Sequence, residues 1–362
     1  MAKKRERPRL KRGGAGLYFT APSQVRCIPT GCRLLDRVLG GGWAEGRVGN
    51  IVGDKSTGKS LVMIETCANF AIKYPDPKEG LIRYREAEAA FDIPYAETVG
   101  LPVDRVDFNE EVSVLTVEEW HADLEEFCDR VEGVRCTSVT KDGERKLVKA
   151  GKPAKAGLYI LDSLDALGDD AENNSEFGAN SYGGKKPKLM GQLFRRNVKR
   201  LERLNVTLLI VSQLRDKIGV TFGETQTRSG GRALDYYASQ IIWLANMGQI
   251  KKTIDKVERP IGVKTRVRCK KNKVGLAYRE CDFPIRFAFG IDDLDASLMW
   301  LDEVGMLGRL GLNDKTAGKY IKKLSKMDRD EYNTEMARVH ATVDTAWFEI
   351  EKKFLPTRRK YG

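Results

Sequence analysis

The chain has 362 residues, a formal net charge of +12 and a hydrophobic content of 41%. The length predicts one large core with smaller terminal pieces, and the apolar content is sufficient to fill that core. No apolar run reaches the ~20 residues of a membrane span and no signal-peptide segment is present, so we expect a cytoplasmic protein with no membrane partner.

The seven cysteines form no C-x-x-C pair, a usage typical of reduced intracellular thiols rather than of a disulfide framework. The positive charge indicates either a polyanionic partner or simple solubility. Residues 3–12 hold seven lysines and arginines and predict a disordered basic arm, which contacts nucleic acid or is a solvated tail. Residues 17–21 (LYFTA) are β-prone, and either add as a strand to a neighbouring subunit or pack on their own domain.

A phosphate-binding motif follows a predicted helix over 28–42 that Thr30 caps and glycines end. Residues 53–60 read G-x-x-x-x-G-K-S between a predicted strand (47–52) and a predicted helix (61–72). In such a loop, backbone N–H groups surround phosphates, the lysine reaches the β- and γ-phosphates, and the serine holds Mg²⁺. The candidate nucleotide-binding residues are Gly53, Asp54, Lys55, Ser56, Thr57, Gly58, Lys59, Ser60 and Leu61.

Carboxylates follow the next predicted strand, over 80–85. Glu86 and Glu88 lie at its end, with Asp92 and Tyr95 soon after. The end of a parallel strand is where such sheets place their chemistry, but a solvated turn explains the same residues. After a predicted helix over 117–131, residues 136–155 are basic and predict a small hairpin that turns at 142–143. A simple surface insertion is the favoured interpretation of that hairpin.

Two further buried strands are predicted at 158–163 and 206–212. The first ends at Asp162, which suits a Walker B carboxylate acting through Mg²⁺, and the second leads to Gln213. Between them lie an irregular stretch over 168–188, functional or disordered, and a basic amphipathic helix over 189–204.

The irregular stretch over 214–231 interleaves basic residues with an aromatic, as single-strand grooves do. Strands are predicted at 240–244, 265–270 and 284–289, the charged later two at sheet edges. Residues 267–273 contain four basic residues. If these cations are unpaired, their mutual repulsion requires an anion nearby. The alternative interpretation is a solvated sheet edge. From about residue 292 the pattern predicts a small helical domain with a basic tail at 358–360.

Taken together, these motifs resemble the RecA family of ATP-dependent DNA recombinases from about residue 25 to residue 289. The most specific stretch is 213–239 (QLRDKIGVTFGETQTRSGGRALDYYAS), and the others are PTGCRLLD at 29–36, EAEAAFDIPYA at 86–96, LDSLDAL at 161–167 and TRVRCKKNKVG at 265–275. The resemblance implies an α/β fold: a RecA-type P-loop ATPase core with a mostly parallel central sheet over 25–291. A basic arm and polymerisation segment (1–24) would precede the core, and a small α-rich C-terminal domain (292–362) would follow it.

The resemblance also implies roles for single residues. Glu88 would polarise the attacking water, Gln213 would link the γ-phosphate to a DNA loop, and Lys59 would act on the phosphates. Lys271 and Lys273 would reach the ATP of a neighbouring subunit. Asp92 and Tyr95 would hold adenine, while Ser60 and Asp162 would hold the metal. The DNA-binding residues implied in the first DNA loop and the helix after it are Tyr182, Lys185, Lys186, Lys188 and Arg195. Those implied in the second DNA loop are Arg215, Lys217, Ile218, Gly219, Val220, Phe222, Arg228, Gly230 and Gly231.

The expected cofactors are ATP and Mg²⁺, and the expected partners are single-stranded DNA, homologous duplex DNA and further copies of the chain in a helical filament. A single-strand-binding or mediator protein is a further candidate partner. The longer first loop, the hairpin and the basic tail depart from bacterial members and indicate a divergent, phage-type member in a host cytoplasm. The rival hypotheses are a RecA-fold hexameric helicase, a non-catalytic single-strand-binding protein and a P-loop switch acting on proteins.

Overall fold

The computed structural model describes residues 25–88, 91–108, 114–140, 145–169, 185–216, 226–228 and 231–356. Within these ranges, no helix is both long and apolar enough to cross a bilayer. The seven cysteines are all free thiols.

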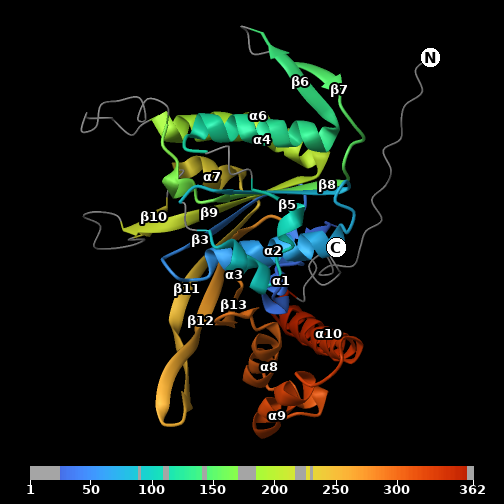
Figure 1. Cartoon of the computed structure of the whole chain (residues 1–362). Helices are drawn as coiled ribbons and strands as arrows, with labels where there is room; N and C mark the ends of the chain where they lie inside the picture. Colours follow the sequence, from blue (N-terminus) through green and yellow to red (C-terminus); the bar gives the residue numbers. More distant parts are fainter. Residues whose placement is uncertain are drawn as a thin grey trace, which may run out of the picture.

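A ten-stranded sheet forms the centre of the molecule (Figure 1). Its strands in spatial order are β14 (Gly290–Ile291), β13 (Glu280–Arg286), β12 (Val257–Asn272), β11 (Gln240–Ile254), β3 (Val48–Gly53), β9 (Val206–Asp216), β8 (Ala156–Asp162), β4 (Gly80–Glu86) and β5 (Val106–Asp107), with β10 (Gln226–Arg228) paired to β9. The strands from β11 to β5 run parallel to one another, whereas β12, β13, β14 and β10 pair antiparallel. This confirms the predicted α/β fold.

Helices cover both faces of the sheet (Figure 1). One face carries α1 (Arg33–Leu39), α2 (Lys59–Lys73) and α3 (Ile93–Thr98), and the other carries α4 (Val117–Glu132), α6 (Lys185–Leu204) and α7 (Gly231–Tyr237). Each face has its own apolar cluster, because strand residues alternate between the two sides. The short elements are β1 (Cys27–Ile28), β2 (Trp43–Ala44) and the 3₁₀ turns Val103–Arg105, Leu164–Ala166 and Leu307–Leu310.

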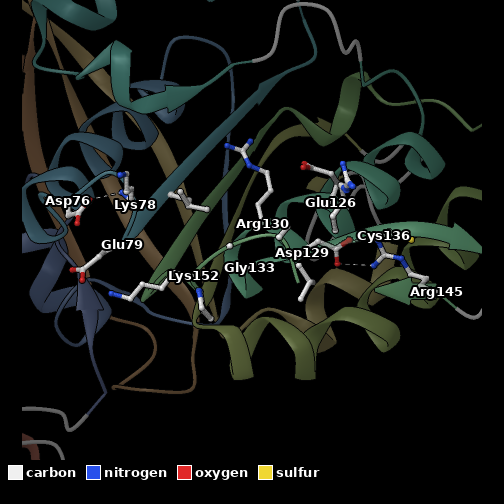
Figure 2. A pocket seen from close by; sticks show the side chains of 16 residues that line it. Asp76, Lys78, Glu79, Glu126, Asp129, Arg130, Gly133, Cys136, Arg145 and Lys152 are labelled. Atoms are coloured by element: carbon white, nitrogen blue, oxygen red, sulfur yellow. Dashed lines mark hydrogen bonds and ion pairs between the residues drawn. The ribbon is translucent and has the colours of Figure 1, made fainter. Parts of the chain in front are cut away.

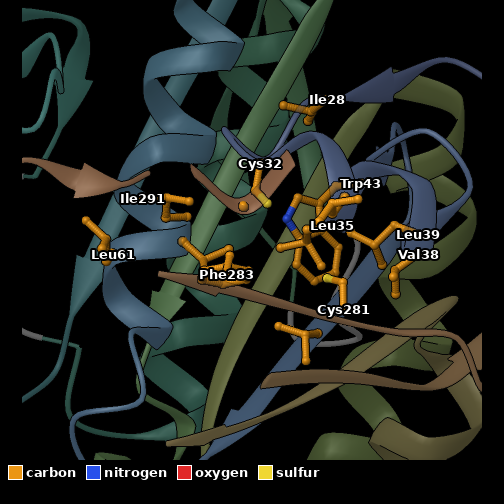
Figure 3. Close-up of a cluster of buried hydrophobic side chains, with 14 of the residues drawn as sticks. Ile28, Cys32, Leu35, Val38, Leu39, Trp43, Leu61, Cys281, Phe283 and Ile291 are labelled. Carbon is orange, nitrogen blue, oxygen red and sulfur yellow. The ribbon is translucent and has the colours of Figure 1, made fainter. Parts of the chain in front are cut away.

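The C-terminal helices are α8 (Asp293–Glu303), α9 (Asp314–Leu324) and α10 (Arg329–Phe354). They share one apolar cluster with α1, α2 and β13, part of which Figure 3 shows around Leu35, Phe283 and Cys281. Ion pairs join α10 to the core, among them Arg279 with Glu351 at 2.6 Å. The helices predicted after residue 292 are confirmed, while their independence as a domain stays a prediction.

Two hairpins project from the core (Figure 1). The first joins β6 (Val134–Val139) to β7 (Arg145–Lys149) and confirms the predicted basic hairpin. The second is formed by β11 and β12, which pair along nearly their whole length and extend well beyond the predicted strands. The expectation that the charged strands lie at edges is wrong for both β12 and β13, because each pairs on two sides. On β12, the charged side chains of Arg268 and Lys270 are nevertheless exposed.

Several predicted boundaries need correction. Helix α1 begins at Arg33 with Cys32 as its N-cap, because the Thr30 hydroxyl bonds Asp36 Oδ1 at 2.9 Å instead of capping the helix. Its predicted glycine end is confirmed by Gly40, whose φ is 86°. Helix α6 begins at residue 185, inside the stretch predicted to be irregular. Part of the stretch 214–231 is likewise regular, since β9 continues to residue 216 and β10 pairs back onto it.

Candidate functional site

The phosphate-binding motif forms a tight turn between β3 and α2. Gly58 adopts φ 90° at the N-cap of α2, and a Cβ there would come within 2.3 Å of the Ile285 side chain. A Cβ on Gly53 would lie 2.7 Å from the Thr57 hydroxyl oxygen. Gly53 is therefore required by close packing, and Gly58 by its left-handed conformation as well. The turn leaves the N-terminus of a 15-residue helix facing the loop, which is the usual environment for a phosphate.

Lys59 lies across this loop, where its Nζ donates to the carbonyl oxygen of Asp54 at 2.7 Å. Burial lowers the pKa of Lys59, while the charges of Asp162 and Glu88 act in the opposite direction. The ammonium thus stands among carboxylates that favour its charged form. A phosphate anion entering the loop would meet the cation, but also the negative charges around it.

Asp162 is the buried acid at the end of β8, with 7% of its surface exposed. Its Oδ2 accepts a hydrogen bond from the Tyr84 hydroxyl at 2.7 Å. Burial raises the pKa of Asp162, whereas hydrogen bonds from Ser60 and Tyr84 lower it. The hydroxyl of Ser60 and the carboxylate of Asp162 are thus in contact, and oxygen donors of these kinds suit Mg²⁺.

Glu88, Ser163 and Gln213 meet at the ends of three parallel strands. Glu88 Oε1 accepts from Gln213 Nε2 at 2.8 Å and from the Ser163 hydroxyl. The strand register explains this meeting, because Glu86 on β4 pairs with Asp162 on β8, and Gly53 on β3 pairs with Gln213 on β9. Strand ends that are far apart in sequence therefore surround the phosphate-binding loop. Glu88 is itself exposed, and its role in catalysis stays a prediction.

Asp165 holds the backbone of Gln213 in place. Its Oδ2 accepts a hydrogen bond from the Gln213 backbone N–H at 2.6 Å. Sequence reasoning assigned no role to Asp165, Ser163 or Tyr84. Ser163 and Asp165 occur in the stretch LDSLDAL, directly after Asp162. Their polar side chains at the same strand end were the sequence signal from which a role in the site could have been predicted. Tyr84 gave no such signal, since it lies in the middle of β4 rather than at the strand end.

Asp92 and Tyr95 lie on α3. Asp92 is the N-cap of this helix, and its Oδ1 accepts from the Tyr95 backbone N–H at 2.9 Å. The pKa of Tyr95 is raised by burial and by the charge of Glu65 on α2. Tyr95 is thus placed beside the helix that follows the phosphate-binding loop. Contact of either residue with adenine stays a prediction.

Lys271 and Lys273 lie away from the other candidate residues of their own chain. The Nζ atoms donate to the Tyr236 carbonyl oxygen at 3.2 Å and 3.3 Å, at the C-terminal end of α7. Lys271 pairs in register with Ile241, whereas the phosphate-binding loop begins beside Leu244. The two lysines therefore sit at the end of the sheet opposite the loop.

The expectation that the cations over 267–273 are unpaired is wrong. Arg268 forms an ion pair with Glu280 at 3.0 Å, and Lys270 lies 4.8 Å from the centre of the Trp243 ring. Lys271 and Lys273 interact with helix carbonyls, where a positive charge is favourable. Mutual repulsion of these four cations consequently gives no argument for a nearby anion.

The candidate DNA-binding residues fall in three groups. Lys188 and Arg195 are exposed on α6, whereas Lys186 donates to the Leu164 carbonyl oxygen at 3.0 Å and is half-buried. For Lys185, Arg215, Arg228 and Gly231 the backbone position is described. Tyr182, Lys217, Ile218, Gly219, Val220, Phe222 and Gly230 lie outside the described residues, as do the basic arm and tail.

A cavity of about 650 Å³ lies elsewhere, at the base of the β6–β7 hairpin (Figure 2). Its walls include Glu79 and Leu81 near the start of β4, and therefore the opposite end of that strand from Glu88. Asp129 and Arg145 face one another there, joined by an ion pair. This cavity is separate from the phosphate-binding loop and is not the nucleotide site.

Comparison with known proteins identifies relatives over most of the chain. A family model described as the RecA N-terminal domain matches residues 16–111 and 141–292. The protein RecA of Syntrophus aciditrophicus is 32% identical over 291 residues, which cover 79% of this chain and 74% of the relative. The protein RecA of Nocardioides sp. is 31% identical over 289 residues (78% and 71%), and that of Chloroherpeton thalassium is 30% identical over 324 residues (87% and 81%).

Proposed function

The chain belongs to the RecA family of recombinases, and on that premise we propose that it hydrolyses ATP while polymerised on single-stranded DNA. The filament would pair its single strand with homologous duplex DNA and promote strand exchange. The observation that carries this proposal is the contact of Gln213 with Glu88 at 2.8 Å. Gln213 lies on β9 and directly precedes the stretch 214–231. A movement of Gln213 at the phosphate site would therefore be passed along the backbone to that stretch.

ATP fits the loop between β3 and α2 through its phosphates. The N–H groups of residues 53–60 and the start of α2 would bind the anion, with Lys59 against the outer phosphates. Ser60 and Asp162 would hold Mg²⁺, which when bound offsets phosphate charge during transfer. The requirement for a divalent cation follows from the charges, because Glu88, Asp162 and Asp165 all lie at this strand end.

Glu88 is the proposed polariser of the attacking water. Its Oε1 is held by Gln213 and Ser163, which leaves Oε2 to accept a hydrogen bond from water. A γ-phosphate in the loop would compete with Glu88 for the amide of Gln213. Movement of that amide toward phosphate would pull on β9, and hydrolysis would release it. In this way the nucleotide state would control the hold on DNA.

The decisive experiment combines electron microscopy with phosphate release. The full chain is incubated with a non-hydrolysable ATP analogue, with and without single-stranded DNA, and imaged. A helical filament formed on DNA, together with DNA-stimulated phosphate release from ATP, is the expected result. Closed rings would identify the helicase alternative instead. DNA binding without stimulated ATP hydrolysis would identify a non-catalytic single-strand-binding protein.

A further inference from the structure

The β6–β7 hairpin carries positive charge, most of which no carboxylate of the described residues neutralises. Its described residues, 134–140 and 145–155, include six lysines and arginines and no acid. Arg145 pairs with Asp129 at 2.5 Å and Lys155 pairs with Glu79 at 2.7 Å. The other four are Arg135, Lys146, Lys149 and Lys152, all exposed, and no carboxylate of the described residues lies within ion-pair distance of them. Cations gathered in this way favour a polyanion.

The hairpin is held in a fixed position by a buried acid. Asp129 on α4 is 3% exposed and pairs both with Arg145 of the hairpin and with Arg200 of α6, each at 2.5 Å. At the hairpin's base, the N–H groups of residues 150 and 151 donate to the carbonyl oxygen of Gly133. An isolated two-stranded hairpin is only marginally stable. These contacts therefore both stabilise the hairpin and orient it relative to α6.

The positive surface continues from the hairpin onto α6. Arg196 and Lys199 are exposed on that helix and lie on one face, because they are three residues apart. The hairpin and the second half of α6 lie side by side, because Asp129 pairs with both Arg145 and Arg200. His121 on α4 lies near both: burial lowers its pKa, the charge of Glu125 raises it, and the charges of Arg196 and Arg145 lower it. We define the basic surface by the exposed cations of these two elements, which are Arg135, Lys146, Lys149, Lys152, Arg196 and Lys199.

The chemistry of this surface favours duplex over single-stranded DNA. Residues 134–155 contain no aromatic side chain, although single-strand sites depend on aromatic rings that stack with bases. A two-stranded β-ribbon fits the major groove of duplex DNA, which is about 12 Å wide. Val139 and Val148 are exposed on the ribbon, where apolar side chains can contact thymine methyl groups in the groove.

We propose that this basic surface binds the phosphate backbone of duplex DNA, with the β6–β7 hairpin inserted along a groove. The inference rests on the proposed function, because a recombinase is what brings duplex DNA to the chain. The surface is separate from the stretch 214–231, since the hairpin joins the sheet at the start of β8 and that stretch begins in the last residues of β9, at the other end of these parallel strands.

The test compares Lys146→Ala/Lys149→Ala with the wild-type chain and with the charge-preserving Lys146→Arg/Lys149→Arg. Binding of a fluorescein-labelled duplex is measured by anisotropy across a KCl series, and binding of a labelled single strand is measured in parallel. Loss of two phosphate contacts should reduce duplex affinity roughly tenfold at low salt and make the salt slope shallower by roughly 2. The arginine variant should bind duplex as the wild type does. Single-strand affinity and its stimulation of phosphate release should stay unchanged in both variants.

Three results would overturn the proposal. Unchanged duplex affinity and slope in the alanine variant would show that the lysines are only solvated. An equal loss of single-strand and duplex binding would show that the surface belongs to the single-strand site. Equal loss in the alanine and arginine variants, with lowered thermal stability, would show a structural role. If wild-type chain shows no DNA-stimulated phosphate release while the duplex results hold, the proposed function fails and the duplex surface stands.

Discussion

At the scale of single residues, Glu88 is distinguished by how its carboxylate is held. Gln213 and Ser163 both donate to Oε1, so one oxygen is committed to the protein and the other is available to water. Replacing Glu88 by glutamine keeps a carbonyl oxygen as the acceptor for these donors. The substitution therefore removes the negative charge while preserving most of the local contacts.

We predict that Glu88→Gln binds ATP but hydrolyses it about 10²–10⁴-fold more slowly, the usual contribution of a general base. Phosphate release measures turnover, and a fluorescent ATP analogue measures binding. Lys59→Ala should instead lose hydrolysis because the cation beside the transferring phosphoryl group is absent. Turnover in Glu88→Gln equal to that of the wild type would remove Glu88 from the catalytic role.

The sequence predicted this site unevenly, for a physical reason. Residues 53–60 are contiguous and their spacing is dictated by phosphate geometry, so the loop could be recognised from the motif alone. The contacts of Glu88 with Ser163 and Gln213 depend on strand register, which no local pattern encodes. The partners of Lys271 and Lys273 were missed for the same reason, because α7 meets β12 only in three dimensions.

At the scale of elements, α2 contains a half-buried acid that joins the phosphate-binding helix to β14. Glu65 Oε1 accepts from the Ile291 backbone N–H at 2.6 Å. The pKa of Glu65 is raised from 4.5 to about 8, chiefly by burial and also by the charge of Asp293, while the hydrogen bond from Ile291 acts in the opposite direction. The folded chain therefore retains this proton over a pH range in which the unfolded chain has lost it.

We predict that Glu65 makes the folded chain less stable as pH rises from about 4.5 to about 8. The sign follows because the folded state binds the extra proton in this window, so raising the pH favours unfolding. Glu65→Gln keeps an acceptor for Ile291 and removes the titration. Thermal melts should show wild-type Tm falling relative to Glu65→Gln by on the order of 5 °C across the window. A constant difference between the two melting temperatures would contradict the raised pKa.

The stretch 214–231 is the second element that a prediction concerns. Arg228 lies on β10, which pairs with the end of β9 beyond Gln213. Arg228→Ala should weaken single-strand binding and make its salt slope shallower by about 1. Phe222→Ala should weaken binding by about 1–3 kcal/mol with little change in slope, because it removes stacking rather than charge. Lys315→Ala on α9 serves as an exposed control, and affinities unchanged in both test variants would make this stretch structural.

The helices and strands predicted most accurately from the sequence were those that bury one or both of their faces. Strand β8 is buried throughout and α4 has a capping box formed by Thr116 and Glu119, so both were predicted nearly to their ends. The outer halves of β11 and β12 were missed because both faces are exposed and charged there. A ribbon without a buried face has no apolar alternation from which a strand can be recognised.

At the scale of the whole molecule, the position of Lys271 and Lys273 constrains how a complete ATP site forms. The two lysines lie at the end of α7, whereas the phosphate-binding loop begins at the opposite end of β3 and on the other side of the sheet (Figure 1). Both lysines donate to the Tyr236 carbonyl oxygen of α7 and point away from the loop of their own chain. Tyr236, beside them, is 71% exposed, as a residue that contacts another subunit would be.

We therefore predict that the ATP site is completed between subunits, with Lys271 and Lys273 acting on the γ-phosphate of a neighbour in the manner of an arginine finger. Lys271→Ala/Lys273→Ala subunits should bind ATP but hydrolyse almost none of it. The two lysines would leave the carbonyl oxygens of α7 when the neighbour's phosphate is present. Lys271→Arg/Lys273→Arg keeps both charges and is the matched control for folding and assembly.

Mixing Lys271→Ala/Lys273→Ala subunits with Glu88→Gln subunits tests the shared site directly. At one kind of mixed interface an intact Glu88 faces intact lysines, because each variant supplies what the other lacks. Phosphate release should therefore rise above that of either variant alone and be highest near equal proportions. Co-assembly is checked by electron microscopy of the mixture on single-stranded DNA. Filaments that contain both variants yet hydrolyse no more ATP than each variant alone would show that Lys271 and Lys273 act within their own subunit or not at all.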